Sequence, residues 1–277
     1  MEHTGKVALI TGGSAGIGLA VGEALARRGA TVVLVARGQE ALDRAVASLG
    51  PRAHGIGLDV ADLSALAALP ARVVAAHGRL DVVVNNAGLH HRGPVASRNA
   101  AELAAMVTVN LTAPVVLARA ALDHLGPGGV IIGVASVAGW APLPDAAVYS
   151  ATKAGLRFFD AALAAEVEGR GVRVATVSPG PVDTGFFGEI EGVSPLVFSQ
   201  PMSTAAEVAD AVVRAIEGGS ADVAIPARSG LLATAAYLFP GLARWLRPRL
   251  ARRGELAKQA YIERKREEAR RRIPPAT

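Results

Sequence analysis

The sequence predicts an α/β fold in which a doubly wound parallel sheet of about seven strands carries helices on both faces. Short β-branched runs alternate with alanine-rich helical patterns along most of the 277 residues. Several of these runs are apolar without polar alternation, which is expected of strands covered on both faces. A glycine-rich stretch, residues 11–18, joins the first apolar run to the first helical pattern. Strands and helices that alternate in this way form a parallel sheet with helices on either side.

The elements follow one another in a regular order. The expected strands are residues 7–10, 31–35, 53–58, 80–84, 129–135, 172–177 and 222–225. The helical patterns lie near residues 16–28, 39–49, 62–77, 100–124, 148–169 and 204–217. We therefore divide the chain into a main domain, residues 1–227, and a C-terminal extension, residues 228–277.

Residues 184–203 interrupt this order with an apolar, proline-containing insert. The insert holds Phe186, Phe187 and Phe198 and follows the end of a strand. Such an insert is a candidate substrate lid, because loops at this end of a strand carry function and close over ligands. The alternative is a surface loop that packs on the protein's own core.

The turn after the first strand has the composition of a phosphate-binding loop. Gly12 allows a tight turn, Gly16 allows backbone N–H groups to approach a phosphate, and Gly18 allows the helix to pack on the strand. The N-terminus of the helix adds partial positive charge. Glycine-rich turns also begin ordinary helices, and the spacing G-x-x-x-G-x-G differs from the commoner G-x-G-x-x-G. Its place at the first strand–helix junction nevertheless favours a dinucleotide site in a Rossmann-type fold.

The end of the second strand predicts which dinucleotide binds. An acidic residue there would hydrogen-bond a ribose 2′-hydroxyl and repel a 2′-phosphate. The sequence instead has the neutral Ala36 followed by Arg37, whose planar fork suits a phosphate. We therefore expect NADP(H) rather than NAD(H). A solvated arginine at a strand end is the alternative.

Tyr149, Lys153 and Ser136 form a candidate set for proton transfer. Tyr149 and Lys153 lie one helical turn apart and share a face. A phenol is a poor base at neutral pH, but a nearby ammonium and an oxidised nicotinamide ring stabilise the phenolate and lower the pKa. Ser136 follows a strand and could donate a hydrogen bond to the substrate oxygen.

With these residues in this order, the chain resembles the short-chain dehydrogenase/reductase family over nearly all of residues 5–227. The resemblance rests on seven motifs: residues 11–18, Asp59-Val60, Asn85-Asn86-Ala87-Gly88, Asn110, Ser136, residues 149–153 and residues 179–184. It implies that Asn110, Ser136, Tyr149 and Lys153 are the catalytic residues.

The resemblance also implies a cofactor-binding set drawn from these motifs. Its members are Gly12, Ser14, Gly16, Ile17, Gly18, Arg37, Asp59, Val60, Asn86, Ala87, Gly88, Tyr149, Lys153, Pro179, Gly180, Val182 and Thr184. In the family pattern Asp59 and Val60 contact adenine, and residues 179–184 fix the nicotinamide carboxamide. Lys153 binds the nicotinamide ribose, and Asn110 holds a water that links Lys153 to solvent as a proton relay.

Simpler structural roles remain open for some of these residues. Asp59 could cap a helix that begins near Asp62, and residues 85–88 could only turn the chain. Asn110 stands inside a helical pattern, where asparagine is unfavourable, and this favours a functional reason for it.

The C-terminal extension mixes aromatic residues with arginines. Residues 231–250 contain Tyr237, Phe239 and Trp245 beside three arginines. Short amphipathic helices of this composition bind membrane interfaces. The same helices could instead pack over the substrate cleft or a partner subunit, with the arginines reaching water. Either arrangement favours a lipophilic substrate, as does the apolar insert.

Two further features of the extension predict its helices. Pro240-Gly241 and Pro248 break the pattern into short pieces. Residues 261–272 are highly charged, with glutamates ahead of arginines, so we expect a solvated helix that frays at its end.

Charge and composition exclude several function classes. The extension holds 13 basic and four acidic residues, a net +9, whereas the first 227 residues have a net −4. Because the basic charge is confined to the extension, we expect no nucleic acid partner.

The chain has no cysteine, which excludes disulfides, thiolate catalysis and cysteine-ligated zinc, and we expect no metal. No secretory signal is visible and no apolar run reaches the roughly 18 residues of a spanning helix, so we expect a cytoplasmic protein.

The expected reaction transfers a hydride between NADP(H) and a carbonyl or alcohol carbon, with Tyr149 giving or taking the proton. The alternative is a regulatory or scaffold protein of this fold that binds NADP(H) with little or no turnover. The complete catalytic set argues against it. The resemblance also implies a homodimer or homotetramer that uses the helices near 100–124 and 148–169. The sequence leaves the substrate and the direction of reaction open.

Overall fold

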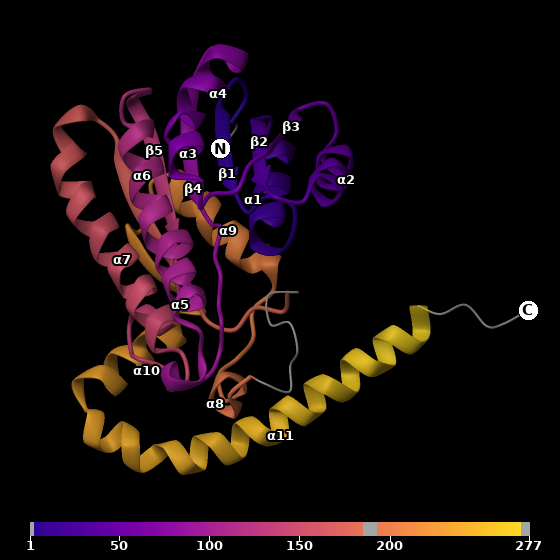
Figure 1. Ribbon diagram of the computed structural model, residues 1–277, viewed down its shortest axis with the longest axis vertical. Coiled ribbons are helices and arrows are strands. Elements are labelled where there is room, and N and C mark those ends of the chain that lie inside the picture. Colours follow the sequence, from indigo (N-terminus) through magenta and orange to yellow (C-terminus); the bar gives the residue numbers. More distant parts are fainter. Residues whose placement is uncertain (1–2, 185–192, 273–277) are drawn as a thin grey trace, which may run out of the picture.

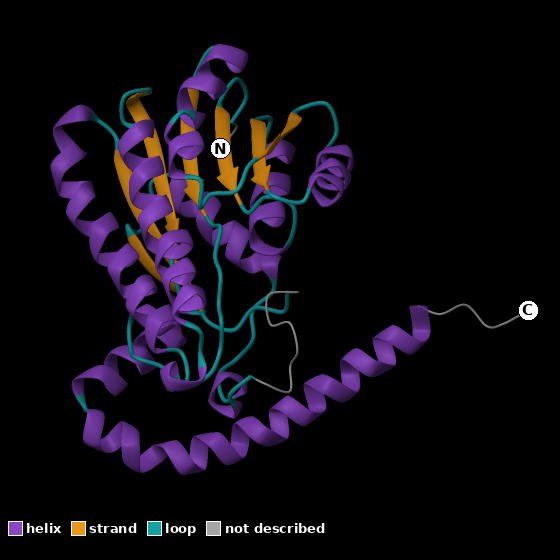
Figure 2. Cartoon of the chain, in the orientation of Figure 1, coloured by secondary structure: helices purple, strands orange, loops and turns teal. Residues whose placement is uncertain are grey.

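Seven parallel strands form one sheet, which confirms the predicted fold class (Figures 1 and 2). The computed structural model describes residues 3–184 and 193–272, with side chains through residue 267. The strand order is β3-β2-β1-β4-β5-β6-β7. The strands are β1 (Val7–Thr11), β2 (Thr31–Ala36), β3 (Ala53–Gly57), β4 (Leu80–Asn85), β5 (Leu125–Val134), β6 (Arg173–Pro179) and β7 (Asp222–Ile225).

Helices cover both faces of this sheet and continue beyond its last strand. They are α1 (Gly16–Arg27), α2 (Gln39–Leu49), α3 (Leu63–Ala67), α4 (Leu69–His77), α5 (Ala100–Val107), α6 (Ala113–Ala121), α7 (Ala147–Val167), α8 (Pro195–Phe198), α9 (Ala205–Ile216), α10 (Ala227–Leu238) and α11 (Pro240–Arg272). Short 3-10 turns occur at Val95–Ser97, Val137–Gly139 and Glu168–Arg170, and a π-helical turn, Thr108–Thr112, joins α5 to α6.

The sheet separates two apolar cores because successive residues of a strand point to opposite faces. On β1, Ala8 and Ile10 belong to the core with α1, α2 and α9. Val7 and Leu9 belong to the core with α4, α6 and α7. Each large aliphatic side chain buried in this way contributes about 1.5–3 kcal/mol by leaving water.

The point at which the strand order reverses determines where a ligand can bind. β2 and β3 extend to one side of β1, whereas β4 to β7 extend to the other. Ligands of open α/β sheets bind beyond the carboxyl ends of the strands at such a point. The strand arrows in Figure 2 point toward the side where α10 and α11 lie. The extension is therefore on the ligand-binding side.

Two expected helices are divided. The stretch near residues 62–77 forms α3 and α4, and Pro70 stands in the first turn of α4, where its missing N–H costs nothing. The stretch near residues 100–124 contains the π-helical turn. Such turns are frequent at functional sites, and this one carries Asn110.

The helical stretch Ala100–Ala121 is long and apolar enough to cross a membrane by length and composition alone. Buried helices of soluble proteins pass the same test. In this structure α6 buries Ala113, Leu117 and Ala121 against the sheet. The α6 part of the stretch therefore packs in the core of the fold.

The helical structure and the burial of the extension differ from what the sequence predicts. α11 runs through Pro248 instead of ending there. Pro248 is exposed, so water can reach the backbone carbonyl that loses its helical partner. The stretch after residue 260 is not uniformly solvated, because Tyr261 is 8% exposed and packs against Phe198. The long helix thus has a buried side as well as a charged one.

Candidate active site

A cavity of about 720 Å³ lies at the carboxyl ends of the strands, within the size range of cofactor and small-molecule sites. Its walls include most of the residues that the sequence singles out. These are Gly12, Gly16, Ile17, Asn86, Ala87, Gly88, Ser136, Tyr149, Lys153, Pro179, Gly180, Val182 and Thr184. The singled-out residues that do not line it are Ser14, Gly18, Arg37, Asp59, Val60 and Asn110.

Hydrogen bonds fasten the glycine turn to the end of β4. The Thr11 hydroxyl accepts from the N–H groups of Asn86 and Ala87 at 3.0 and 3.1 Å. The Asn86 amide donates to the carbonyl oxygens of Thr11 and Gly12 at 2.9 and 3.2 Å. Gly12 has φ +67°, and a Cβ there would lie 2.8 Å from the Asn86 amide nitrogen. The segment after β4 therefore fixes the shape of the glycine turn and does more than reverse the chain.

The N-terminus of α1 faces the cavity without a side-chain cap. Its N-cap residue is Ala15, and its first turn has no acidic residue. The first N–H groups of a helix have no partner within the helix, so they suit an anionic ligand. A Cβ at Gly16 would meet only Thr184, at 3.5 Å, whereas a Cβ at Gly18 would lie 2.3 Å from the Gly12 carbonyl oxygen. Gly16 keeps the approach open, and Gly18 allows the helix to pack on the turn.

Arg37 and Asp59 form a rim at the ends of β2 and β3. Arg37 Nη1 lies 3.8 Å from Asp59 Oδ2, and the two side chains are 72% and 46% exposed. Asp59 Oδ1 accepts from the Ala61 N–H, whereas Asp62 caps α3. Asp59 is therefore not the helix cap. An exposed ion pair holds its partners weakly, so the Arg37 fork remains accessible to a phosphate.

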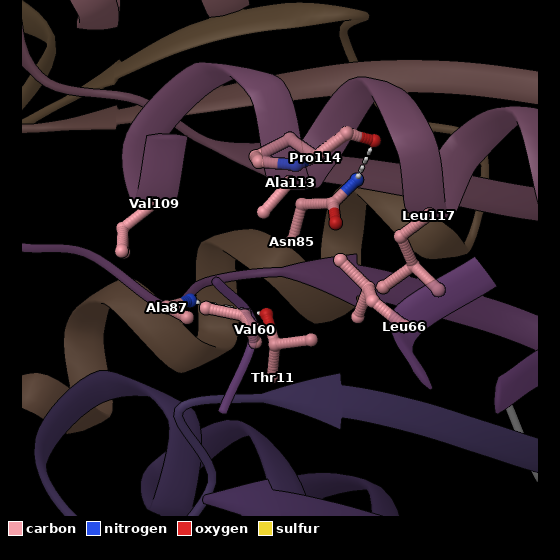
Figure 3. Close-up of a pocket in the computed structure, with 9 residues that line it drawn as sticks. All are labelled: Thr11, Val60, Leu66, Asn85, Ala87, Val109, Ala113, Pro114 and Leu117. Atoms are coloured by element: carbon pink, nitrogen blue, oxygen red, sulfur yellow. Dashed lines mark hydrogen bonds between the residues drawn. The ribbon is translucent and has the colours of Figure 1, made fainter. Parts of the chain in front are cut away.

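Val60 lies behind this rim. Figure 3 shows it beside Thr11 and Ala87 at the wall of a small apolar pocket of about 10 Å³. On the other side of this pocket, the Asn85 amide donates to the Pro114 carbonyl oxygen at 3.4 Å (Figure 3). Val60 is 8% exposed and therefore belongs to the core rather than to the rim.

Tyr149, Ser136 and Lys153 meet inside the large cavity. The side chains of Ser136 and Tyr149 are hydrogen-bonded to each other. The Lys153 side chain is 4% exposed, and its ammonium donates to the Val134 carbonyl oxygen at 2.8 Å. The Lys153 nitrogen lies 5.9 Å from the centroid of the Tyr149 ring. The phenol thus has a hydroxyl partner and a nearby cation.

The pKa of the Tyr149 phenol differs from the lowered value that the sequence predicts. Burial raises the pKa of the Tyr149 phenol, although the Ser136 hydrogen bond and the charge of Arg92 act in the opposite direction. Burial lowers the pKa of Lys153 to about 8, against the opposing effect of Asp160. The protein groups alone therefore keep the phenol protonated at neutral pH. The expected fall of its pKa is not produced by Lys153 alone, whose nitrogen is directed to a backbone carbonyl.

Asn110 lies behind the cavity in the π-helical turn and is 0% exposed. Its Oδ1 accepts from the Leu89 N–H at 2.7 Å, and its Nδ2 donates to the Leu89 carbonyl oxygen at 2.8 Å. The same nitrogen donates to the Thr152 hydroxyl at 3.3 Å. Asn110 therefore links the segment after Gly88 to the helix that carries Lys153. The water-holding role that the resemblance implies stays a prediction.

His90, which the sequence did not single out, stacks on Tyr149. The ring centroids are 4.1 Å apart and the planes differ by 11°. Burial lowers the pKa of His90 to about 3, aided by the charges of Arg92, His91 and Lys153. His90 is thus neutral at physiological pH. Its place after the Asn85–Gly88 motif, at the carboxyl end of a parallel strand, is the signal that could have identified it.

Asp160 is a second functional candidate that the sequence did not indicate. It is 1% exposed, and its Oδ2 accepts from the Thr176 hydroxyl at 2.9 Å. Burial raises the pKa of Asp160 to about 7. It lies two turns after Lys153 on α7, a spacing that belongs to no catalytic motif.

The extension and the insert supply the outer wall of the cavity. The lining residues from α10, α11 and the residue between them are Leu232, Ala233, Ala235, Ala236, Phe239, Leu242, Ala243, Leu246, Arg247 and Leu250. From the insert, Leu196, Val197, Ser199 and Gln200 line it. Phe198, which belongs to the candidate lid, packs on Tyr261, with ring centroids 5.6 Å apart. Phe186 and Phe187 lie outside the described residues.

The geometry defines the class of protein: an uncapped helix N-terminus and a Ser–Tyr–Lys cluster share one switch-point cavity, as in nicotinamide-dependent oxidoreductases. The short chain dehydrogenase family matches residues 6–192, and the chain belongs to this family. It is accordingly an oxidoreductase that interconverts carbonyl and alcohol groups with a nicotinamide cofactor.

Individual relatives agree with this assignment. The ketoacyl reductase HetN of Nostoc sp. is 37% identical over 228 residues, which are 80% of this chain and 79% of HetN. A short chain dehydrogenase from Burkholderia cenocepacia J2315, solved in complex with NADP, is 33% identical with a TM-score of 0.74, over 80% of this chain and 96% of that one. A short-chain dehydrogenase from Streptomyces avermitilis is 32% identical with a TM-score of 0.75, over 89% of this chain and 98% of that one.

Proposed function

We propose that the protein is an NADP(H)-dependent oxidoreductase acting on a lipophilic ketone or aldehyde and the corresponding alcohol. The observation that carries the proposal is the position of Tyr149. Its phenol is hydrogen-bonded to Ser136 and close to Lys153, in the cavity that the glycine turn also lines. A proton donor and a site for a dinucleotide phosphate thus open into one space.

The glycine turn fits the pyrophosphate of a dinucleotide. Gly16 leaves room in front of the uncapped N-terminus of α1, and no acidic residue stands in the first turn. Asn86, Ala87 and Gly88 line the cavity beside the turn, and Pro179 to Thr184 border its other side. These groups would hold the cofactor between β1, β4 and β6. Bound there, the nicotinamide supplies or accepts the hydride.

Arg37 supports NADP(H) over NAD(H). Ala36 occupies the position at which an acidic residue would select a free 2′-hydroxyl. The Arg37 guanidinium stands exposed at the end of β2 and can pair with a 2′-phosphate. The Burkholderia relative was solved with NADP, which supports the same choice.

The side chains of this protein transfer the proton and stabilise the charges that form during the transfer. Tyr149, protonated because burial raises its pKa, gives its proton to the oxygen of the carbonyl during reduction. Ser136 donates a hydrogen bond to the same oxygen and stabilises the charge that develops on it. The Lys153 ammonium stabilises the resulting phenolate. Asn110 would relay the replacing proton through a water. In alcohol oxidation the phenolate accepts the proton.

The substrate half of the cavity supports a lipophilic substrate. Ala141, Pro142, Leu143 and Pro144 line it from the segment after β5, and aliphatic residues of α10 and α11 face it from the extension. No acidic side chain occurs among the described residues that line the cavity. A largely apolar molecule with one carbonyl or hydroxyl group fits these walls.

The proposal also covers the oligomeric state of the protein and its location in the cell. Phe158 on α7 and Val107 on α5 are 71% and 41% exposed, which supports a homodimer or homotetramer built on these helices. On α10 and α11, exposed apolar residues accompany arginines, which supports a cytoplasmic enzyme with peripheral membrane contact.

We also propose residues 1–227 as the catalytic domain and 228–277 as an extension that completes its cavity.

A carbonyl panel tests this function. The purified protein is assayed with NADPH and with NADH against short, steroidal and long-chain carbonyls, while the absorbance of the reduced cofactor is followed. We expect turnover of long or polycyclic carbonyls and a lower KM for NADPH than for NADH. A lower KM for NADH would contradict the role of Arg37, and the absence of turnover on the whole panel would contradict the enzymatic function.

A further inference from the structure

α11 is attached to the beginning of the segment that follows β6. The Tyr261 hydroxyl donates to Asp183 Oδ1 at 2.6 Å. Lys265 Nζ lies 2.9 Å from the same oxygen, and Arg264 lies 3.3 Å from Asp183 Oδ2. Burial would raise the pKa of Asp183, but the hydrogen bonds from Tyr261 and Lys265 and the two positive charges hold it below its ordinary value. Asp183 is therefore an ionised anchor for α11.

The same face of α11 is also attached further along this segment. The ammonium of Lys258, which is 8% exposed, donates to the Val193 carbonyl oxygen at 2.9 Å. A Cβ at Gly254 would lie 1.9 Å from the Pro195 carbonyl oxygen, so the helix approaches α8 closely only because this residue is glycine. Residues 254, 258, 261 and 265 recur at helical spacing and form one face. The attachment is thus a built contact along three turns of the helix.

Asp183 stands between two residues that border the cofactor side of the cavity. Val182 and Thr184 both line the cavity. The Asp183 N–H donates to the Ser203 carbonyl oxygen at 3.0 Å, and the Thr184 N–H donates to the Val182 carbonyl oxygen at 2.8 Å. The Thr184 methyl group lies 3.5 Å from where a Cβ of Gly16 would be. Asp183 thus joins α11 to the residue that faces the glycine turn, because Thr184 follows Asp183 directly in the chain.

We propose that Tyr261 is a positioning residue for the cofactor, acting through Asp183 to hold Thr184 beside the glycine turn. The inference rests on the proposed binding of NADP(H). It assigns to the extension a role in cofactor binding in addition to its role as a cavity wall. Tyr261 itself does not line the cavity.

Two tyrosine variants test this role. Tyr261→Phe removes the hydroxyl and keeps the ring that packs on Phe198. Tyr237→Phe is the matched control, because Tyr237 lies on α10, is 66% exposed and does not line the cavity. NADPH affinity is measured by fluorescence titration, with KM for NADPH and kcat at saturating NADPH. We expect about a tenfold weaker Kd and higher KM for Tyr261→Phe with kcat nearly unchanged, since a hydrogen bond to a charged group is lost. We expect no change for Tyr237→Phe.

The outcomes separate this inference from the function on which it rests. If the unaltered protein binds NADPH and Tyr261→Phe binds it equally well, the positioning role is wrong and the proposed function stands. If the unaltered protein binds no NADPH, both are wrong. Asp183→Asn serves where Tyr261→Phe fails to fold: weakened NADPH binding supports the role, and unchanged binding overturns it. In the double variant the two losses should be less than additive, because both changes weaken the same Tyr261–Asp183 contact.

Discussion

At the scale of single residues, the sequence predicts which residues form the site better than it predicts their protonation and their contacts. Ser136, Tyr149 and Lys153 follow from motif order, and the structure brings them into one cavity. Their protonation could not be predicted, because it depends on burial and on Asp160 and Arg92, which no motif marks. The position of His90 after the Asn85–Gly88 motif could have indicated it, but its contact with Tyr149 joins two elements distant in the sequence and could not be predicted.

The pKa of Lys153 predicts a pH dependence. Burial lowers it to about 8, so the ammonium is present at neutral pH and is lost as the pH rises through that value. Reduction needs both the protonated phenol and the ammonium. We expect kcat/KM for NADPH, which reports the free enzyme, to be flat at neutral pH and to fall above about pH 8. A profile that rises between about pH 8 and pH 9 would contradict this assignment.

The stacking of His90 on Tyr149 predicts the effect of two substitutions. His90→Ala removes the ring that holds the phenol, whereas His90→Phe keeps a flat ring without an ionisable group. An aromatic pair contributes about 0.5–1.5 kcal/mol, so we expect kcat to fall up to about tenfold in His90→Ala and to stay near that of the unaltered protein in His90→Phe. Steady-state kinetics measures this. Equal rates for all three proteins would show that the stack has no part in turnover.

At the scale of elements, the presence of the seven strands was predicted more reliably than the division of the helices, although β5 begins at Leu125, four residues before the expected strand. Apolar runs such as the one that forms β1 determine a strand by themselves, because both faces of the sheet are covered. The division of a helix depends on local features such as Pro70 and the π-helical turn. Local propensity does not reveal that α11 continues through Pro248 or that it packs closely on α8.

Two glycines of α11 test this contact. Gly254→Ala places a Cβ against the Pro195 carbonyl oxygen, whereas Gly241→Ala meets nothing within 4 Å. We expect Gly254→Ala to lower the free energy of unfolding by about 1–3 kcal/mol, because overpacking displaces the helix. Gly241→Ala should raise it by up to about 1 kcal/mol through helix propensity. Urea denaturation measures both. A Gly254→Ala protein as stable as Gly241→Ala would mean that α11 does not pack closely on α8.

At the scale of the whole molecule, the position of the extension was the least predictable feature. Tyr261 and Asp183 are 78 residues apart, and no pattern in either segment indicates their contact. The structure shows that α10 and α11 line the cavity, while Leu238 and Trp245, which do not line it, are 62% and 61% exposed. Figure 1 shows α11 crossing beneath the sheet as a long helix. Residues 223–254 contain six arginines and no acidic residue, so this exposed apolar surface is also cationic.

Vesicle flotation tests the proposed membrane contact. We expect the protein to float with phosphatidylcholine vesicles that contain phosphatidylglycerol and to float less without the anionic lipid or at high salt. Trp245→Glu should abolish flotation, whereas Phe158→Glu should not, because Phe158 is similarly exposed but lies on α7. Equal flotation of the two variants would exclude the extension as the membrane-binding surface.

The proton transfer by Tyr149 is the central claim, and one measurement tests it most directly. The rate of NADPH oxidation with an accepted carbonyl is compared in single turnover for the unaltered protein and Tyr149→Phe, both saturated with NADPH. We predict a loss of about 10²–10⁴-fold for Tyr149→Phe, the usual contribution of an acid/base group, with NADPH still bound. An undiminished rate in Tyr149→Phe would contradict the account.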